Sequence, residues 1–591
     1  MPKQIEKKLV EDYAVKKLQE LGWQFIAPPE LVRESTKEPL LIENLKQALS
    51  RLNESLNITD EEINEVVINL QLLPIDQEGI KKFLSWLKYG IGIKFEKDGI
   101  VKYVRLLDFE DFEKNEFIFS RQVHYKGIEV RIPDIIFYVN GIPLSQIECK
   151  NPVSIRTGWE EGYYQIKEYE KIISELYKYV QIGISLAEKA RYFPIVPWQE
   201  EVKTYLWRQD GKAEDEAIFE MLKPEVFVDI LRNFLFIREE KGKVTKVIAR
   251  YMQYRAVNKI YQRVVDETNK EVGKNKGLIW HWQGSGKTLT MIFAAHKLYF
   301  EKKLHNPSIF FIIDRRDLEE QLNIELGSLG LNFSFEKIEK VKKLKEIITY
   351  DNFRGKRGVF LTLIHKFQPD EEFLPENLKD GIDIIANRKN IICFLDEVHR
   401  SQYGLLAAQM KNVLKSAYFF GFTGTPISED DRSTYREFGY PVDKEPYLDK
   451  YFIDDSIKDG FTVPIAYEPR LEKKVHVEKT NLSAFLSKQF EGEDLDEIKK
   501  EKIKKSVKKQ LNKVNVFLEN EKRINIIAAD IAKHFKDHLD GRFKAMLVAG
   551  SRKACVLYKK HLDKYLPPEY SEIVMTFNQS DKGILKDFYG E

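Results

Sequence analysis

The apolar positions along the chain predict an opening helix followed by a mixed helical and β-rich region. Between residues 5 and 22 apolar side chains recur at close to helical spacing, and Gly22 follows as a stop signal. From residue 40 to 87 the pattern stays helical, whereas from residue 101 to 150 it changes to short β-rich runs. We therefore expect this first part to be α+β, with its strands in the second half.

A different pattern begins after two charge-dense stretches, at residues 208–215 and 238–246. Short, continuous apolar runs now alternate with helical segments. Strands of this kind have both faces covered by helices, so the pattern predicts a parallel sheet. The predicted strands are residues 278–280, 309–313, 359–361, 391–395 and 418–422.

The last part of the chain begins with a Lys/Glu-dense segment at residues 491–522. Such a charge run predicts a solvated helical face or a linker, with a DNA-binding arm as the alternative. A strand followed by a helix is predicted at residues 543–560.

Length and composition exclude several classes of protein. The 591 residues correspond to about four folding units of roughly 150 residues each. The 43% hydrophobic and 32% charged residues are typical of a folded, water-soluble protein. Lys plus Arg total 95 and Asp plus Glu 93, so any nucleic-acid groove has to be local. Three cysteines without metal-type spacing indicate a reducing compartment. No apolar run approaches the ~18 residues of a membrane span, so we expect a cytoplasmic protein without a membrane segment.

A glycine-rich loop at residues 283–288 lies between a predicted strand and a predicted helix. Backbone N–H groups of such a loop surround phosphates, Lys287 reaches the β and γ oxygens of ATP, and the Thr288 hydroxyl binds Mg²⁺. His281 stands where the G-x-x-x-x-G-K-[ST] pattern has its first glycine. The alternative is a chance turn between strand and helix. The residues predicted to bind ATP are Gly284, Ser285, Gly286, Lys287 and Thr288.

An acidic pair, Asp396-Glu397, follows the predicted strand at residues 391–395. The carboxyl ends of parallel strands are where such sheets bind ligands. Asp396 is expected to hold Mg²⁺ through its hydration shell, and Glu397 to polarise the water that attacks the γ-phosphate. The alternative is an ordinary helix N-cap with an acid in its first turn.

A second set of acids lies in the β-rich region. Asp134, followed after thirteen residues by Glu148-Cys149-Lys150, fits the pattern P-D-x(n)-(D/E)-x-K. Two convergent carboxylates bind Mg²⁺, which activates water, and Lys150 adds positive charge beside the nucleophile. This arrangement predicts hydrolysis of a phosphodiester. The alternative is a surface hairpin with a salt bridge worth under about 1 kcal/mol.

The hairpin between these acids decides whether they meet. A two-residue loop at residues 140–141 would put Asp134 and Glu148 on opposite faces of the sheet. A three-residue loop, 139–141, would pair Asp134 with Gln146 and bring all three side chains of the pattern to one face. We predict the three-residue loop.

Three segments resemble motifs I, II and III of superfamily 2 helicases and translocases. They are residues 284–288, 396–399 and 422–426, and their order and spacing also match. The resemblance implies that Thr423 and Thr425 couple ATP hydrolysis to movement.

Other segments resemble parts of the same family. Residues 250–254 resemble the adenine-reading Q motif, which implies that Gln253 makes a bidentate contact to the base. Residues 314–318 and 362–367 resemble segments that follow the nucleic-acid backbone. For the second of these, an ordinary helix start is an equal alternative.

Three further residues resemble elements that accompany the acid pattern at Asp134 in a known nuclease family. Gln165 and Tyr169 resemble the Gln-x-x-x-Tyr element of the RecB-like branch of PD-(D/E)xK nucleases. Glu11, on the opening helix, resembles the helical acid of that branch, which implies an additional metal ligand. A solvent-facing acid is the alternative for Glu11.

The combination resembles the restriction (motor) subunit of type I restriction-modification enzymes. The resemblance implies an α/β protein with a PD-(D/E)xK nuclease domain at residues 1–235. A RecA-like lobe at 236–470 and a partial second RecA-like lobe at 471–591 would follow. It implies ATP-dependent translocation on double-stranded DNA, Mg²⁺-dependent cleavage, and methyltransferase and specificity subunits as partners. A stand-alone repair or processing helicase-nuclease, or a nucleotide-gated assembly subunit with an inactive nuclease, are the alternatives.

The sequence departs from the family at its end. Residues 544–552 resemble motif IV, but no segment before Glu591 resembles motifs V and VI, which would supply an arginine finger. We therefore expect an N-terminal fragment or a naturally shortened chain that binds ATP and hydrolyses it poorly.

Overall fold

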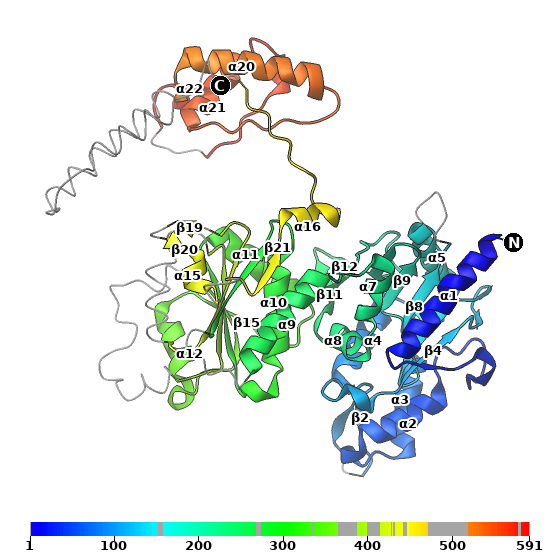
Figure 1. Cartoon of the computed structure of the whole chain (residues 1–591). Helices are drawn as coiled ribbons and strands as arrows, with labels where there is room; N and C mark the ends of the chain where they lie inside the picture. The colour runs from blue at the N-terminus through cyan, green and yellow to red at the C-terminus, as the bar shows by residue number, and fades with distance from the viewer. Residues whose placement is uncertain are drawn as a thin grey trace. The chain divides into compact units, whose positions relative to one another are not determined.

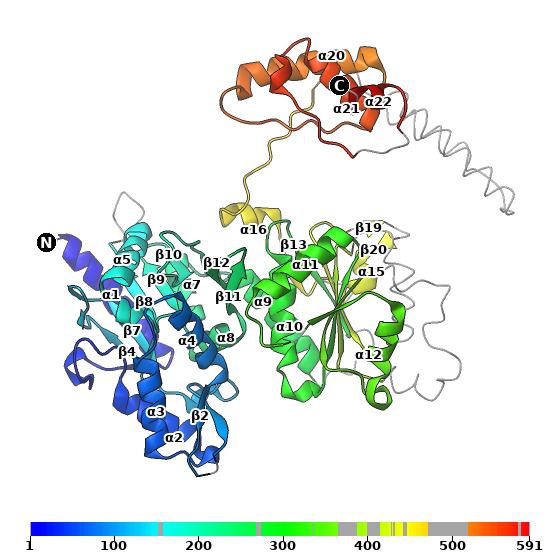
Figure 2. The same cartoon turned by 180° about the vertical axis from the view of Figure 1, so that it is seen from behind.

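The computed structural model divides into two compact units, residues 1–463 and 464–591 (Figures 1 and 2). None of the helices in the described ranges is long and apolar enough to span a bilayer. The residues that the structure describes are 2–97, 99–151, 158–266, 274–333, 335–363, 387–398, 414–426, 428–429, 432–440, 446–470, 518–576 and 581–589.

Helices open the first unit, as the apolar spacing predicts. Helix α3 begins with a capping box between Thr59 and Glu62. Helix α4 begins where the Asp76 carboxylate accepts from the Gly79 N–H at 2.8 Å, and it ends at Gly90, which has a positive φ of 87°. The helices are α1 (Pro2–Glu20), α2 (Ile42–Leu52), α3 (Asp60–Gln71) and α4 (Gln77–Tyr89), followed by the hairpin of β2 (Ile91–Lys94) and β3 (Val101–Val104).

A six-stranded mixed sheet follows in the order β1-β4-β7-β8-β9-β10. Two pairs, β1 with β4 and β8 with β9, are parallel, and the other three pairs are antiparallel. Every residue of β7 and β8 is buried, which is the burial of strands covered on both faces. The strands are β1 (Gln24–Phe25), β4 (Phe117–Arg121), β7 (Ile135–Val139), β8 (Ile142–Cys149), β9 (Ile182–Leu186) and β10 (Ala190–Pro194).

Aromatic packing fixes one face of this sheet. The Trp23 ring makes edge contacts with Phe117, Phe137 and Phe227, at centroid distances of 5.2, 5.0 and 5.8 Å. Its indole N–H, which would be costly to bury unpaired, donates to the Leu222 carbonyl at 2.7 Å. Helix α5 (Gly158–Ile172) packs on β8 and β9.

The β7–β8 hairpin corrects the predicted loop. Asn140 and Gly141 are both left-handed (φ 52° and 78°), and Val139 pairs directly with Ile142, so the loop has two residues rather than three. A bulge then restores the alignment, because Tyr138 pairs with Pro143 whereas Phe137 pairs with Ser145. Leu144 is the extra residue.

Beyond the bulge the register brings the two acids together. Ile135 pairs with Ile147, so the next position places Asp134 across from Glu148, on one face of the sheet. The expected common face is therefore present, although it is produced by a bulge and not by the loop. The predicted pairing of Asp134 with Gln146 is wrong, since Gln146 pairs with Ile136.

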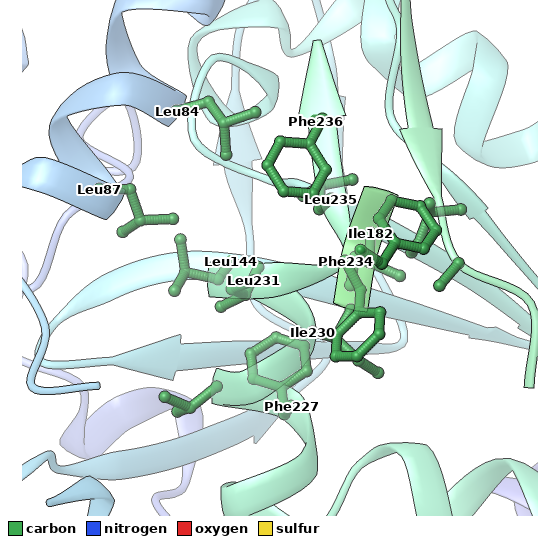
Figure 3. Packing of buried hydrophobic residues seen from close by; sticks show 14 of the residues in the cluster. Leu84, Leu87, Leu144, Ile182, Phe227, Ile230, Leu231, Phe234, Leu235 and Phe236 are labelled. Atoms are coloured by element: carbon green, nitrogen blue, oxygen red, sulfur yellow. The ribbon is translucent and has the colours of Figure 1, made fainter. Parts of the chain in front are cut away.

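One hydrophobic cluster continues from this sheet into the next part of the unit. It includes Leu144 of β8 and Ile182 of β9, and it runs through α8 (Pro224–Asn233) and β11 (Leu235–Glu240) (Figure 3). The Phe236 ring of β11 stacks on Phe293 at a centroid distance of 5.8 Å. The short helix α7 (Glu214–Met221) precedes α8, and β12 (Lys243–Ile248) pairs with β11.

The second sheet of this unit has seven strands, and every pair in it is parallel. All five predicted strands are present in it. The order is β15 (Phe335–Ile338), β16 (Gly358–Leu363), β14 (Ser308–Ile313), β17 (Ile391–Asp396), β18 (Tyr418–Thr423), β13 (Lys276–His281) and β21 (Asp449–Tyr451). Its helices include α9 (Tyr251–Val265), α10 (Lys287–Tyr299), α11 (Arg316–Ser328), α12 (Val341–Phe353), α15 (Thr434–Phe438) and α16 (Ile453–Lys458).

The second unit contains α20 (Glu521–His534), α21 (Arg552–Leu562) and α22 (Ile584–Tyr589). The predicted helix at its centre is confirmed as α21, but the predicted strand before it is wrong. Residues 543–549 form no strand, and Phe543, Met546 and Val548 are 68%, 88% and 80% exposed. A strand needs a neighbour for its backbone groups, and none pairs with it among the residues described in this unit. Most of the charge run, residues 491–517, lies outside the described residues.

Candidate functional site

The glycine-rich loop at residues 283–288, named the phosphate loop after its predicted role, joins β13, which ends at His281, to α10, which begins at Lys287. Gly284 and Gly286 are left-handed, with φ of 78° and 84°, a conformation that favours glycine. A Cβ atom on Gly286 would lie 2.6 Å from the Gln253 amide nitrogen. Helix α10 begins directly after Gly286, and the first backbone N–H groups of a helix have no partner within it and can bind an anion.

Gln253 ties helix α9 to this loop. Its amide oxygen accepts from the Arg250 N–H at 2.9 Å, and its amide nitrogen donates to the Gly286 carbonyl at 3.0 Å. The side chain is almost fully buried. Both ends of the amide thus contact backbone, and the contact of Gln253 with an adenine base stays a prediction.

His281, which replaces the expected first glycine, belongs to a buried polar cluster that the sequence does not reveal. Its Nε2 atom lies 2.8 Å from the Asp449 carboxylate on β21, and both side chains are fully buried. Arg255 and Lys259 of α9 also donate to Asp449. Burial by itself raises the pKa of Asp449, but the hydrogen bonds from His281 and Arg255 outweigh it and hold that pKa well below its usual range.

Asp396 and Glu397 lie where β17 ends. Burial, together with the charge of Glu397, raises the pKa of Asp396 to about 6, while the nearby charge of Lys287 opposes the rise. Glu397 is left-handed (φ 50°), which is uncommon for a residue other than glycine and is frequent at functional sites. The acidic pair and the phosphate loop therefore meet at one edge of the sheet, as the sequence predicts for parallel strands.

The third motif lies against the phosphate loop. Thr423, the last residue of β18, is buried and pairs with Trp280 of β13. The Trp280 indole donates to the Gly424 carbonyl at 3.2 Å, and the exposed Thr425 donates its N–H to the Thr423 hydroxyl at 3.1 Å. The third motif is therefore in direct contact with β13, the strand that leads into this loop.

Part of the predicted nucleic-acid contact region can be placed. Asp314 and Arg315 follow β14, and the charge of Asp314 acts on the Asp396 carboxyl. Residues 364–367 of the other segment, and His399 and Arg400 after the acidic pair, lie outside the described residues.

The second site is built on the β7–β8 hairpin. Asp134 and Glu148 are 1% and 0% exposed. The Asp134 carboxylate accepts from the Cys149 N–H at 2.9 Å. One Glu148 oxygen accepts from the Asp134 N–H at 3.3 Å and from the Gln146 amide at 2.8 Å. Because burying a carboxylate is costly unless hydrogen bonds compensate, these donors keep both acids in place.

Lys150 lies at the open side of the same site. Its Nζ atom is 3.9 Å from the second Glu148 oxygen and donates to the Gln165 amide oxygen. The Gln165 amide nitrogen in turn donates to the Tyr169 hydroxyl. Both residues of the predicted Gln-x-x-x-Tyr element therefore lie next to Lys150, where they line a groove of about 730 Å³.

Glu11 also reaches this site, through a residue that the sequence analysis missed. The Gln122 amide nitrogen lies 3.2 Å from each Glu11 oxygen and 3.1 Å from an Asp134 oxygen. Glu11 is 8% exposed, so the alternative of a solvent-facing acid is wrong. No motif contains Gln122, which explains why the sequence did not indicate it.

The residues present are compatible with a divalent cation. Mg²⁺ is usually held by one or two carboxylates while it keeps several waters, and Asp134 and Glu148 could supply these. Within the described ranges, no three or more His, Cys, Asp or Glu side chains form a group that could hold a metal ion by itself. The chemistry of the donors thus fits a hard, partly hydrated ion.

Comparison with known proteins shows the family to which the chain belongs. Residues 3–202 match the model of the type I restriction enzyme R protein N terminus, and residues 252–502 match that of the SWI2/SNF2 ATPase. The chain is 34% identical to a protein of Methanocaldococcus jannaschii named as the MjaVIIIP type I restriction enzyme endonuclease subunit, over 97% of this chain and 58% of that protein. It is 29% identical to the HindI endonuclease subunit of Haemophilus influenzae, over 97% of this chain and 56% of that protein. The chain thus spans somewhat more than half the length of these relatives.

Proposed function

Because this chain is a homologue of the endonuclease subunits of type I restriction enzymes, we propose that it is an ATP-dependent DNA translocase joined to a Mg²⁺-dependent DNA endonuclease. The observation that carries the nuclease half is the alignment of Asp134, Glu148 and Lys150 on one face of a buried hairpin. We assign residues 1–235 to a PD-(D/E)xK fold and the seven-stranded sheet to a first RecA-like lobe.

In the motor half, the chain's own residues bind and position the nucleotide. The N–H groups of the phosphate loop and Lys287 hold the triphosphate, while Thr288 and Asp396 would hold Mg²⁺, which would supply neutralisation of the phosphate charge. Glu397 orients the attacking water. Thr423 and Thr425, which lie against the loop, pass its movement to the rest of the lobe, and Gln253 keeps the loop attached to α9.

In the nuclease half, Asp134 and Glu148 would hold Mg²⁺, which would supply Lewis-acid activation of water and charge neutralisation at the scissile phosphate. Lys150, oriented by Gln165, places a positive charge beside the phosphate oxygens. Cys149 donates to the Asp134 carboxylate and Gln146 donates to that of Glu148, and these hydrogen bonds hold both side chains in position.

The partners follow from the same assignment. We propose double-stranded DNA as the substrate, held through phosphate contacts without base reading, and methyltransferase and specificity subunits as the source of sequence recognition.

The test is cleavage of a supercoiled plasmid with Mg²⁺ and ATP, with and without added methyltransferase and specificity subunits. Asp134→Asn and Lys150→Ala are expected to lower cleavage by on the order of 100-fold while ATP binding stays unchanged. Glu129→Gln, at an acid whose side chain is 63% exposed, is the matched control. Cleavage that survives in Asp134→Asn would contradict the proposal. Cleavage without the partner subunits would favour a stand-alone helicase-nuclease.

A further inference from the structure

Gln122 is held in an unusual position at the end of β4. Its backbone is left-handed (φ 54°), a conformation uncommon for glutamine, and its N–H donates to the Asp134 carbonyl at 3.0 Å. A strained backbone conformation of this kind persists only where contacts with neighbouring residues enforce it, and such residues are frequent at functional sites.

The Gln122 side chain joins two acids that are far apart in sequence. One amide nitrogen lies within 3.2 Å of both Glu11 oxygens and of one Asp134 oxygen. Two carboxylates this close to one donor repel each other, and a neutral amide lessens the repulsion without adding charge. This nitrogen lies between carboxylate oxygens of α1 and of the residue before β7. A negatively charged group in its place would attract a cation.

Helix α1 has a separate attachment to the same strand. Arg121, the neighbour of Gln122, pairs with Asp12 at 2.7 Å, and both side chains are partly exposed. The attachment of α1 thus does not depend on Gln122 alone, and Arg121 offers a matched control for any purely structural effect.

We propose that Gln122 is a positioning residue of the nuclease metal site, where it brings Glu11 beside Asp134 so that Glu11 acts with Asp134 on the bound cation. The inference rests on the proposed nuclease function and extends it. It makes Gln122 the link between the opening helix and the hairpin that carries the acids.

The experiment measures Mn²⁺ binding to the full chain without nucleotide by calorimetry, and the thermal midpoint with and without Mn²⁺. Gln122→Gly keeps the left-handed backbone without strain, so its effect reports the missing side chain. We expect its Mn²⁺ dissociation constant to rise about tenfold. Gln122→Glu places a carboxylate where the amide lies, so we expect a lower midpoint without metal and several-fold tighter Mn²⁺ binding.

Arg121→Ala and Asp134→Asn separate the possible outcomes. Arg121→Ala is expected to leave the Mn²⁺ affinity within twofold of the unmodified chain. If Gln122→Gly also stays within twofold, or if Gln122→Glu weakens Mn²⁺ binding, the role of Gln122 is refuted. Should Asp134→Asn leave Mn²⁺ binding unchanged, the nuclease site itself is wrong. A loss in Asp134→Asn without one in Gln122→Gly refutes only the positioning role.

Discussion

Asp449→Asn is the sharpest test of how the phosphate loop is supported. Asp449 lies on the edge strand β21 and accepts from His281 Nε2 at 2.8 Å, from Arg255 at 2.8 and 3.1 Å, and from Lys259 at 2.8 Å. Asparagine has nearly the same shape, but it has one acceptor oxygen, carries no charge, and turns an N–H₂ group toward a cation. The substitution therefore removes electrostatic support and leaves the packing intact.

The size of the effect follows from the exposure of the partners. Removing one partner of a buried ion pair costs about 3–5 kcal/mol, and one hydrogen bond to a charged group about 1.5–3 kcal/mol. The Arg255 and Lys259 side chains are 36% and 46% exposed, so water compensates part of their loss. His281 is fully buried and loses its charged partner outright. We expect Asp449→Asn to lower the free energy of unfolding by about 2–4 kcal/mol.

The pH dependence gives an independent signature. The pKa of Asp449 is lowered in the folded chain, so its stabilisation is fully present above the unfolded value of about 4 and is lost as pH falls through the folded value. Asp449→Asn should therefore weaken the loss of stability on acidification. Because His281 ends the strand that leads into the phosphate loop, the affinity for an ATP analogue should fall as well.

The assay is denaturant unfolding followed at several pH values, with nucleotide binding measured in parallel. Asp454→Asn, at an exposed acid on α16, is the control and should change stability by under about 0.5 kcal/mol. A loss below about 1 kcal/mol in Asp449→Asn, with unchanged nucleotide affinity, would show that the cluster does not support the loop.

Three further predictions use other features of the first unit. Deleting Ile136 while the bulge is kept would place Asp134 across from Ile147, on the opposite face from Glu148, and should abolish Mg²⁺-dependent plasmid cleavage while ATP binding persists; retained cleavage would contradict the register argument. Burial raises the pKa of Glu170 to about 7 against the opposing charge of Lys167, so stability should fall as pH rises from about 4 to about 7. Glu170→Gln should flatten that profile in thermal unfolding, and an unchanged slope would refute the assignment. Gly286→Ala should weaken binding of an ATP analogue about tenfold, because its Cβ would lie 2.6 Å from Gln253 and its backbone is left-handed. An unchanged affinity in calorimetry would contradict this prediction.

The parallel sheet was predictable where its strands are long and apolar. The five interior strands are visible in the sequence as continuous hydrophobic runs, because both faces of each strand are covered. The edge strand β21 has no such run, because Asp449 and Lys450 are two of its three residues. Ion pairs to α9 and the bond to His281 hold it in place, and a local sequence pattern does not contain such tertiary contacts.

The same distinction applies to the candidate sites. The phosphate loop and the acids at Asp134 and Glu148 were predictable, because their chemistry requires particular residue types at a short spacing. Gln122 and Asp449 were not, since each has a partner more than 100 residues away in the sequence. Single polar residues of this kind acquire their role only when the fold brings their partners to them.

The hairpin shows how two correct local rules can give a wrong prediction. Asn140-Gly141 favours a two-residue turn, and a metal site requires Asp134 and Glu148 on one face; a simple hairpin cannot satisfy both. The bulge at Leu144 satisfies both, and Leu144 is fully buried in the cluster that also contains Leu231 and Phe236 (Figure 3). If the Leu144 side chain left this position, it would leave a cavity in that cluster. The packing that joins the hairpin to α8 and β11 therefore also fixes the alignment of the two acids.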